Sequence, residues 1–170
     1  MFWFLCESYN RMITTNPNFM SNREYLNSRG KMMVNKHKII AFLDAEFPQT
    51  KCKVEAVGDF AATVRHPIGE AELRPGGTVS GPVMMTVADV ALYVAILGEI
   101  GLVKMTVTVS LTINFLRKPT ADRDIIAQCK LLKVGKSLAV GEVSLYSEGD
   151  DRAVAHVVGT YSIPAQVSST

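Results

Sequence analysis

The sequence predicts one α+β domain in which an antiparallel sheet wraps around a single long helix. An apolar run over residues 82–100 is too long for a strand, two strand-like stretches precede it, and four follow it with short connections. The chain of 170 residues fits one domain. Its 48% hydrophobic and 20% charged residues are ordinary for a folded globular protein.

Net charge and cysteine usage exclude several function classes. The chain has 18 Lys and Arg against 16 Asp and Glu, and this net charge of +2 is too weak for a nucleic-acid-binding surface. Cys6, Cys52 and Cys129 are far apart and form no C-x-x-C pair, so we predict neither disulfides nor a zinc or other metal site. The apolar start is too short for a signal peptide and lacks a basic flank, so we expect a cytoplasmic protein.

Residues 1–31 differ from the rest of the chain because they are rich in Asn and show no sustained period. We interpret them as an N-terminal extension, either poorly ordered or read from a start assigned too early. The alternative is an arm that packs on a partner subunit. The folded domain is then expected over residues 32–165, with residues 166–170 as a tail.

The domain is expected to begin with a short helix and a hairpin. Apolar residues recur at near-helical spacing over residues 34–47, and Pro48 ends this helix. Residues 52–57 and 60–66 then alternate around a Gly-Asp turn, which is typical of a hairpin. The Gly- and Pro-containing segment 74–82 predicts a loop.

The apolar run over residues 82–100 predicts a helix that is buried on nearly all sides. A membrane span also needs about 20 apolar residues. Asp89 lies within the run, however, and a charge at the bilayer centre costs about 2.5–3.5 kcal/mol. We therefore expect the buried centre of a soluble domain, which also explains the slightly positive mean hydropathy of +0.16.

Four strands are expected after this helix. Residues 105–116 alternate strictly, which predicts polar side chains on one face and, on the other, Met105, Val107, Val109, Leu111, Ile113 and Phe115. Residues 124–134, 138–147 and 153–163 follow. Short turns join these last three stretches, so they should pair antiparallel as neighbours.

Asp89 is the most informative residue of the predicted helix. A carboxylate in an apolar helix costs stability unless it is partnered, which suggests that it is present for chemistry. Thr86, Asp89 and Tyr93 share one helical face, so this polar stripe could line a site. The alternative is a structural Asp that bonds to backbone or to a facing loop, and the residues alone leave both open.

The start of the helix is a second candidate site. Ser80 or Gly81 is expected near the N-cap, with Pro82 near the first helical position. Unpaired amides and the positive end of the helix dipole can stabilise a carbonyl oxygen or an oxyanion there. The alternative is a capped helix that binds nothing.

Residues of about 34–164 resemble a hotdog-fold acyl-CoA thioesterase of the PaaI type, the phenylacetic acid degradation-like family. The resemblance rests, in this order, on GGTVSGPVMMTVADVALYVAI, TVSLTINFLRKP, LLKVGKSLAVGEVSLYS and HVVGTYSIP. It implies a curved antiparallel sheet around a central helix and homodimers that pair into tetramers. It also implies hydrolysis of an acyl-CoA thioester at a subunit interface, without a cofactor.

The resemblance also assigns roles to individual residues. Gly77-Thr78 and Gly81 match the family's Gly-Thr-x-His-Gly-Gly motif, and Asp89 matches the acid eight residues later. By resemblance, the Gly81 amide polarises the thioester carbonyl, and Asp89 of the partner subunit acts as nucleophile or activates water. Thr108 falls near a pocket Ser or Thr that helps to position water in some relatives.

Three family positions differ in this chain. Ser80 replaces the family's His, Pro82 replaces the Gly that follows Gly81, and Arg74 replaces an upstream Asn. Ser80 can still donate a hydrogen bond, and Pro82 leaves the Gly81 amide intact. We therefore predict Ser80 and Pro82 as substrate-binding residues, together with Thr86 of the polar stripe.

Coenzyme A requires cations for its phosphates. The residues that the family places near the CoA entrance are Arg117, Lys118, Lys133 and Lys136. For each of these cations, the alternative is a solvated surface residue.

Two other functions are alternatives to the thioesterase. The loss of the His favours a non-catalytic acyl-CoA-binding or regulatory hotdog protein. A hotdog hydratase or dehydratase needs an acid paired with a His, and no His lies in or beside the central helix. The sequence therefore predicts an acyl-CoA thioesterase that binds neither nucleic acid nor membrane.

Overall fold

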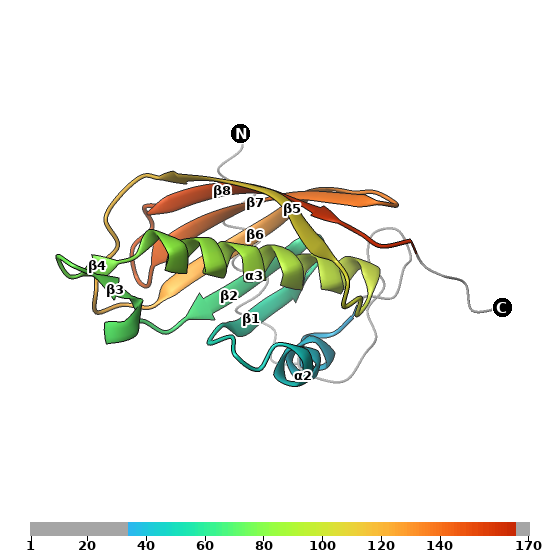
Figure 1. Ribbon diagram of the computed structural model, residues 1–170, viewed down its shortest axis with the longest axis horizontal. Helices are drawn as coiled ribbons and strands as arrows, with labels where there is room; N and C mark the ends of the chain where they lie inside the picture. The colour runs from blue at the N-terminus through green and yellow to red at the C-terminus, as the bar shows by residue number, and fades with distance from the viewer. Residues whose placement is uncertain (1–33, 166–170) are drawn as a thin grey trace, which may run out of the picture.

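The computed structural model describes residues 34–165 of the chain. The long helix α3 (Gly81–Ile100) lies along a six-stranded antiparallel sheet and contacts all six strands, while the short helix α2 (Lys36–Glu46) packs beside β1 (Lys53–Gly58) (Figure 1). The predicted α+β architecture, a sheet wrapped around one long helix, is confirmed. The extension predicted over residues 1–31 and the tail predicted over residues 166–170 lie outside the described residues.

The order of strands in the sheet is β1-β2-β6-β7-β8-β5, and each neighbouring pair is antiparallel. The strands are β1 (Lys53–Gly58), β2 (Ala61–His66), β5 (Val107–Phe115), β6 (Ile125–Val134), β7 (Leu138–Ser147) and β8 (Ala155–Ser162). The hairpin and the four later strands therefore lie where the sequence predicted them.

The segment before α3 is more ordered than its Gly and Pro content predicted. One turn of 3-10 helix, η2 (Glu70–Glu72), leads into two short strands that pair with each other, β3 (Leu73–Arg74) and β4 (Thr78–Val79). The prediction of a plain loop over residues 74–82 is corrected accordingly, because this small hairpin and the start of α3 occupy it.

Local sequence signals explain where the helices begin and end. The Asn35 side chain caps α2 by accepting a hydrogen bond from the Lys38 amide, and α2 ends just before Pro48. Ser80 is the N-cap of α3, which begins one residue before the predicted start and carries Pro82 in its first turn. Gly101 ends α3 with a φ of 101°, a conformation that favours glycine.

The hydrophobic core lies between α3 and the sheet. Inward-facing residues of β6, β7 and β8 alternate with exposed or partly exposed ones, and 12 of the 20 residues of α3 are buried. By length and composition alone α3 could cross a membrane, with a mean hydropathy of 1.8 over an 18-residue window. Because 67% of that window is buried within the fold, core packing accounts for its apolar character.

Strand β5 departs from the predicted strict alternation. A bulge between Thr108 and Ser110 places Thr108 opposite Tyr161 of β8, on the face toward α3, whereas Val107 lies opposite Ser162 on the other face. The prediction of one continuous apolar face over residues 105–116 is therefore wrong. The extra residue of the bulge reverses the two faces and turns Thr108 toward the helix.

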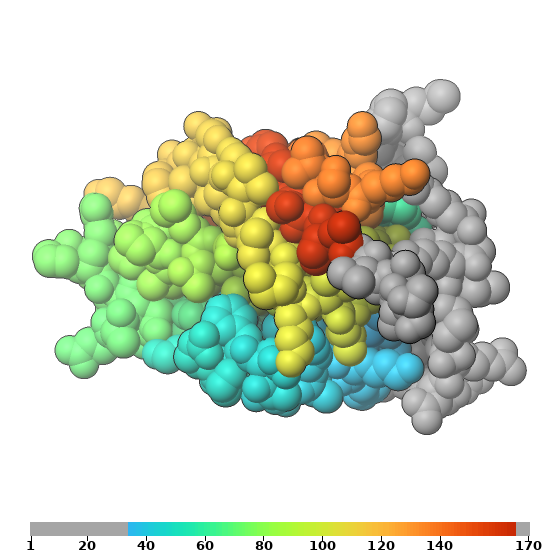
Figure 2. All heavy atoms as spheres, turned by 45° about the vertical axis from the view of Figure 1, so that its right-hand side comes forward, coloured from blue at the N-terminus to red at the C-terminus, as the bar shows by residue number. Residues whose placement is uncertain are grey.

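Strand β5 also forms one edge of the sheet. Its sequence, VTVSLTINF, has no Pro or charged residue of the kind that protects edge strands. Val107, Val109 and Phe115 are 51%, 60% and 52% exposed, and Figure 2 shows this stretch in yellow at the surface. Among residues 34–165 no strand pairs with the outer side of β5, so an apolar strand edge lies beside α3.

Candidate active site

The carboxylate of Asp89 lies between α3, β5 and β8. The Thr108 hydroxyl donates a hydrogen bond to Asp89 Oδ1 at 2.7 Å, and the Tyr161 hydroxyl donates to the same oxygen at 2.5 Å. Within residues 34–165, no hydrogen bond reaches Oδ2. One carboxylate oxygen is therefore held by two hydroxyl groups, while the other has no partner in the described part of the chain.

Tyr161 is a site residue that sequence reasoning missed. It is 2% exposed, and its ring stacks on that of Tyr93 with 6.4 Å between centroids and 15° between planes. Burial and the neighbouring Asp89 carboxylate raise the pKa of Tyr161, so the hydroxyl keeps its proton. In the sequence, Tyr161 stands out only as a residue of a predicted strand, two residues after Gly159. No sequence spacing connects it to Asp89.

A pocket of about 300 Å³ lies beside Asp89. Its walls are mainly aromatic and aliphatic, with the carboxylate and a few hydroxyl groups as the polar elements. Such a mixture is typical of small-molecule sites. The lining residues are Phe47, Asp89, Val90, Tyr93, Thr106, Val107, Thr108 and Tyr161.

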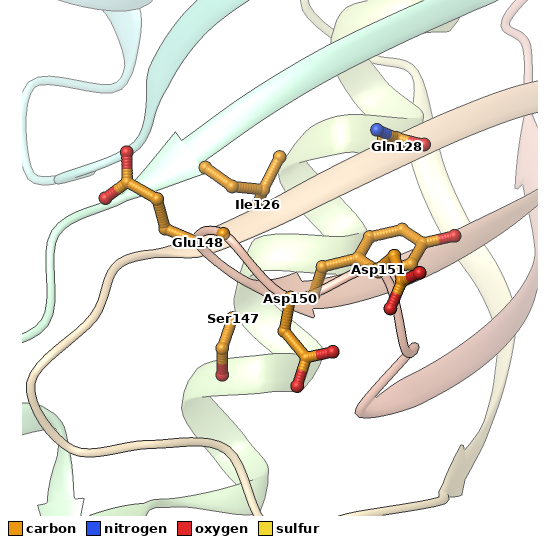
Figure 3. A pocket seen from close by; sticks show the side chains of 8 residues that line it. Ile126, Gln128, Ser147, Glu148, Asp150 and Asp151 are labelled. Carbon is orange, nitrogen blue, oxygen red and sulfur yellow. The ribbon is translucent and has the colours of Figure 1, made fainter.

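A second hollow of about 310 Å³ is formed by residues of β6 and β7 and the turn after β7 (Figure 3). Its carboxylates point in different directions rather than toward a common centre. Two of them are already paired, Glu148 with Arg65 at 2.7 Å and Asp150 with Arg152 at 3.0 Å. Across the described residues, no group of three or more His, Cys, Asp or Glu side chains could hold a metal ion.

The start of α3 lies at the other end of β5. The Ser80 hydroxyl makes no capping hydrogen bond, although Ser80 is the N-cap. A Cβ on Gly81 would lie 3.1 Å from Cζ of Phe115, so the aromatic ring packs directly against this glycine. The first amides of a helix have no partner within the helix, which leaves the Gly81 amide free to bind a carbonyl oxygen.

The two predicted halves of the site are too far apart within one chain. Gly81 and Asp89 are eight residues apart on α3, which corresponds to about 12 Å along the helix axis. A group that polarises a carbonyl and a group that attacks it must each lie about 3 Å from atoms of the same carbonyl. One chain therefore holds both groups but cannot bring them to one carbonyl.

Of the remaining predicted residues, Thr86 and Pro82 do not line the pocket. The exposed Thr86 hydroxyl donates to the Pro82 carbonyl at 3.0 Å, and Pro82 lies exposed in the first turn of α3. Both residues belong to the half of α3 nearer to Gly81.

The four predicted phosphate-binding cations do not converge within one chain. Arg117 and Lys118 follow β5 at the end of the sheet where α3 begins, whereas Lys133 and Lys136 belong to the β6–β7 hairpin at the opposite end. All four are exposed, and the Arg117 guanidinium donates to the Ala153 carbonyl at 2.8 Å.

Known proteins are similar to this chain in both sequence and fold. The family model of the thioesterase superfamily matches residues 76–154, which span α3, β5, β6 and β7. A candidate thioesterase from Silicibacter sp. TM1040 is 39% identical over 84% of this chain and 99% of its own, with a TM-score of 0.73. The chain belongs to the thioesterase superfamily. The expected likeness to PaaI-type hotdog thioesterases is thereby confirmed, and the class of enzyme is that of a thioesterase.

More distant structures share the hotdog fold of this thioesterase superfamily member. The Escherichia coli PaaI protein from the phenylacetic acid degradation operon is 20% identical, covers 75% of this chain and 91% of its own, and has a TM-score of 0.61. Zebrafish thioesterase superfamily member 2 is also 20% identical, covers 77% and 99%, and has a TM-score of 0.69. Among curated proteins, none is similar enough to the chain to count as a match.

Proposed function

We propose that the protein hydrolyses an acyl-CoA thioester with water, giving the free acid and CoA. The observation that supports this most directly is the state of the Asp89 carboxylate. Two hydroxyl groups hold Oδ1, Oδ2 has no partner among the described residues, and a largely apolar pocket lies alongside. A held carboxylate beside an apolar pocket suits attack on an acyl group.

We infer that the site is completed by a second copy of the chain. In one chain, Asp89 lies near the Thr108 end of β5, and Gly81 lies near its Phe115 end. If two β5 edges pair antiparallel about a two-fold axis, the Thr108 end of one meets the Phe115 end of the other. Such pairing would bring Asp89 of one subunit toward Gly81 of its partner, and it would cover the apolar edge.

The chemistry follows from these two groups. The Gly81 amide and the N-terminus of α3 would polarise the acyl carbonyl and stabilise the oxyanion. Asp89 of the other subunit would either attack the carbonyl carbon or take a proton from a water molecule that attacks it. If Asp89 attacks, an acyl anhydride with its carboxylate forms as the carbon–sulfur bond breaks, and water then hydrolyses the anhydride to release the acid. If water attacks, the acid forms directly as that bond breaks. In both routes the CoA thiolate leaves and is protonated. Thr108 would orient the carboxylate. The Ser80 hydroxyl, which makes no capping hydrogen bond, could donate to the substrate.

The same pairing would bring the four predicted phosphate-binding cations close to one site. Arg117 and Lys118 lie at the Gly81 end of one chain, and Lys133 and Lys136 lie at the opposite end. An antiparallel pair would therefore supply the two cation pairs to one site from different subunits. CoA is part of the substrate in this proposal and is not a cofactor.

The test of this function is thiol release from a panel of short-chain, long-chain and aryl acyl-CoAs. We expect wild-type protein to release CoA and Asp89→Asn to lose almost all of that activity, because the amide can neither attack nor accept a proton. Asp44→Asn, on the exposed face of α2, is the matched control and should remain active. Wild-type rates in Asp89→Asn would contradict the mechanism.

The alternative is a protein that binds acyl-CoA without hydrolysing it. It is favoured by Ser80, which stands where the family carries a His. Tight binding of acyl-CoA without release of thiol from any member of the panel would support this alternative over hydrolysis.

A further inference from the structure

We propose that Tyr161 is a positioning residue that holds one oxygen of the Asp89 carboxylate and so leaves the other available to react. The inference rests on the proposed thioester hydrolysis and adds a role that the resemblance did not assign. The Tyr161 hydroxyl lies 2.5 Å from Asp89 Oδ1 and 2.9 Å from the Asp89 carbonyl oxygen. Its single proton is therefore shared between the side chain and the backbone of the same residue, and this limits rotation of the carboxylate relative to α3.

Tyr161 is itself held rigidly. The side chain is buried, stacks on Tyr93, and lies on a strand that is paired on both sides, with β7 and with β5. A rigid donor of this kind orients an acceptor at little entropic cost, because few rotamers are lost when the hydrogen bond forms.

The bulge in β5 supplies the second donor to the same oxygen. It turns the Thr108 hydroxyl toward α3, so that both hydroxyls meet at Oδ1 rather than one at each oxygen. Any rotation of the carboxylate away from this orientation would break both hydrogen bonds until the equivalent oxygen took the same place, and each bond is strengthened by the charge of the carboxylate. Oδ2 is then the oxygen that attacks the carbonyl or accepts the proton of water.

The direction of the hydrogen bond is also fixed. Because burial and Asp89 raise the pKa of Tyr161, its hydroxyl stays protonated and donates to the carboxylate. Tyr161 therefore acts through Asp89 and need not exchange a proton with the substrate.

The experiment compares Tyr161→Phe with wild type in steady-state hydrolysis of the best acyl-CoA of the panel. We expect kcat to fall about tenfold or more while KM stays within about twofold, because a charge-assisted hydrogen bond is lost but the apolar ring remains. Tyr146→Phe, which removes a hydroxyl from a partly exposed residue of β7, is the matched control for loss of a hydroxyl. An unchanged kcat, or a raised KM with unchanged kcat, would overturn the proposal.

A double-mutant cycle separates positioning from a general structural effect. In the Asp89→Asn background, Tyr161→Phe should cause no further loss of the residual rate, because its action passes through the carboxylate. If no member of the panel is hydrolysed by wild type, the proposed function fails; if Asp89→Asn is itself fully active, the proposed role of Asp89 fails. If Asp89→Asn is inactive and Tyr161→Phe is fully active, only the positioning role fails.

Thr108→Val provides a second route if Tyr161→Phe folds poorly. This variant removes the other donor from an exposed position, so folding should be preserved. We expect a smaller fall in kcat at constant KM, since Tyr161 still holds Oδ1. A Thr108→Val variant with wild-type kcat would contradict the proposal that two donors hold one oxygen and leave the other available to react.

Discussion

Gly141 of β7 and Gly159 of β8 lie directly opposite each other, and Leu92 of α3 fills the space that their missing side chains leave. A Cβ on Gly141 would lie 2.7 Å from Cδ2 of Leu92, and a Cβ on Gly159 would clash with Cδ1 of the same leucine. The two glycines therefore let the helix approach the middle of the sheet.

The first prediction tests this close approach. Gly159→Ala should lower the free energy of unfolding in urea by about 1–3 kcal/mol, because the added methyl group overpacks a full core. Gly69→Ala is the control, since a Cβ there makes only an ordinary contact of 3.4 Å with Glu72. Shortening the leucine in a Gly159→Ala, Leu92→Val double variant should recover part of the loss. Equal stability of Gly159→Ala and wild type would contradict the packing described here.

A second prediction concerns the origin of the two halves of the site. Gly81→Ala places a methyl group 3.1 Å from the Phe115 ring, beside the amide proposed to bind the carbonyl, so activity should fall. Stability should change by less than about 1 kcal/mol, because Phe115 is half exposed and Ala favours helix.

Equal amounts of Gly81→Ala and Asp89→Asn, unfolded and refolded together, should then regain up to about one quarter of wild-type activity. Half of the dimers would be mixed, and each mixed dimer would hold one intact site.

Failure of complementation in that mixture, with mixed dimers present, would mean that Gly81 and Asp89 of the same chain act together. The presence of mixed dimers can be measured independently by placing an affinity tag on one variant and recovering both chains with it.

The third prediction concerns the edge strand. Val109→Lys places a charge on the exposed edge of β5, where natural edge strands use Lys to prevent pairing. We expect light scattering after size exclusion to show monomers, and we expect hydrolysis to fall in parallel. Val158→Lys is the control, because Val158 is 40% exposed on the neighbouring strand β8 rather than at the sheet edge. Unchanged assembly of Val109→Lys would exclude pairing through this edge.

The fourth prediction is a dependence of stability on pH. Burial lowers the pKa of His66 below its ordinary value of 6.5, although Glu72 opposes this effect. Between the folded and unfolded pKa values the unfolded chain binds the proton and the folded chain does not, so stability falls as pH drops below about 6.5. Lys51 lowers the pKa of Glu72 from 4.5, and the stability that this contributes is lost only at more acidic pH.

Thermal unfolding between about pH 7.5 and about pH 5 measures this dependence. His66→Gln should flatten the decline of the midpoint temperature with falling pH, whereas His156→Gln, at a partly exposed position of β8, should leave it in place. An equal decline in wild type and His66→Gln would assign it to other groups.

Much of the fold could be predicted because local patterns determine it. The long apolar run of α3 and the alternation of β6, β7 and β8 persist in the structure almost unchanged. Asp89 could also be singled out, since a lone acid in an apolar helix is visible without knowledge of its neighbours.

The rest of the site depends on contacts between distant segments. The hydrogen bond from Tyr161 to Asp89 joins residues 72 positions apart, and it depends on the register of β8 against α3. The alternation of β5 suggested that Thr108 faces away from the apolar side chains, but a one-residue bulge reverses the faces. The cations Arg117 and Lys133 looked equivalent as strand-end residues, and only the order of the strands separates them.

The exposed edge of β5 makes the activity per chain depend on the concentration of the protein. If two chains must meet before Asp89 and Gly81 face the same carbonyl, an isolated chain is inactive however well it folds. At concentrations below the dissociation constant of the pair, the number of complete sites would rise with the square of the chain concentration. Dilution alone would then abolish the activity. A modest increase in synthesis of the protein would produce a more than proportional increase in the rate of thioester hydrolysis.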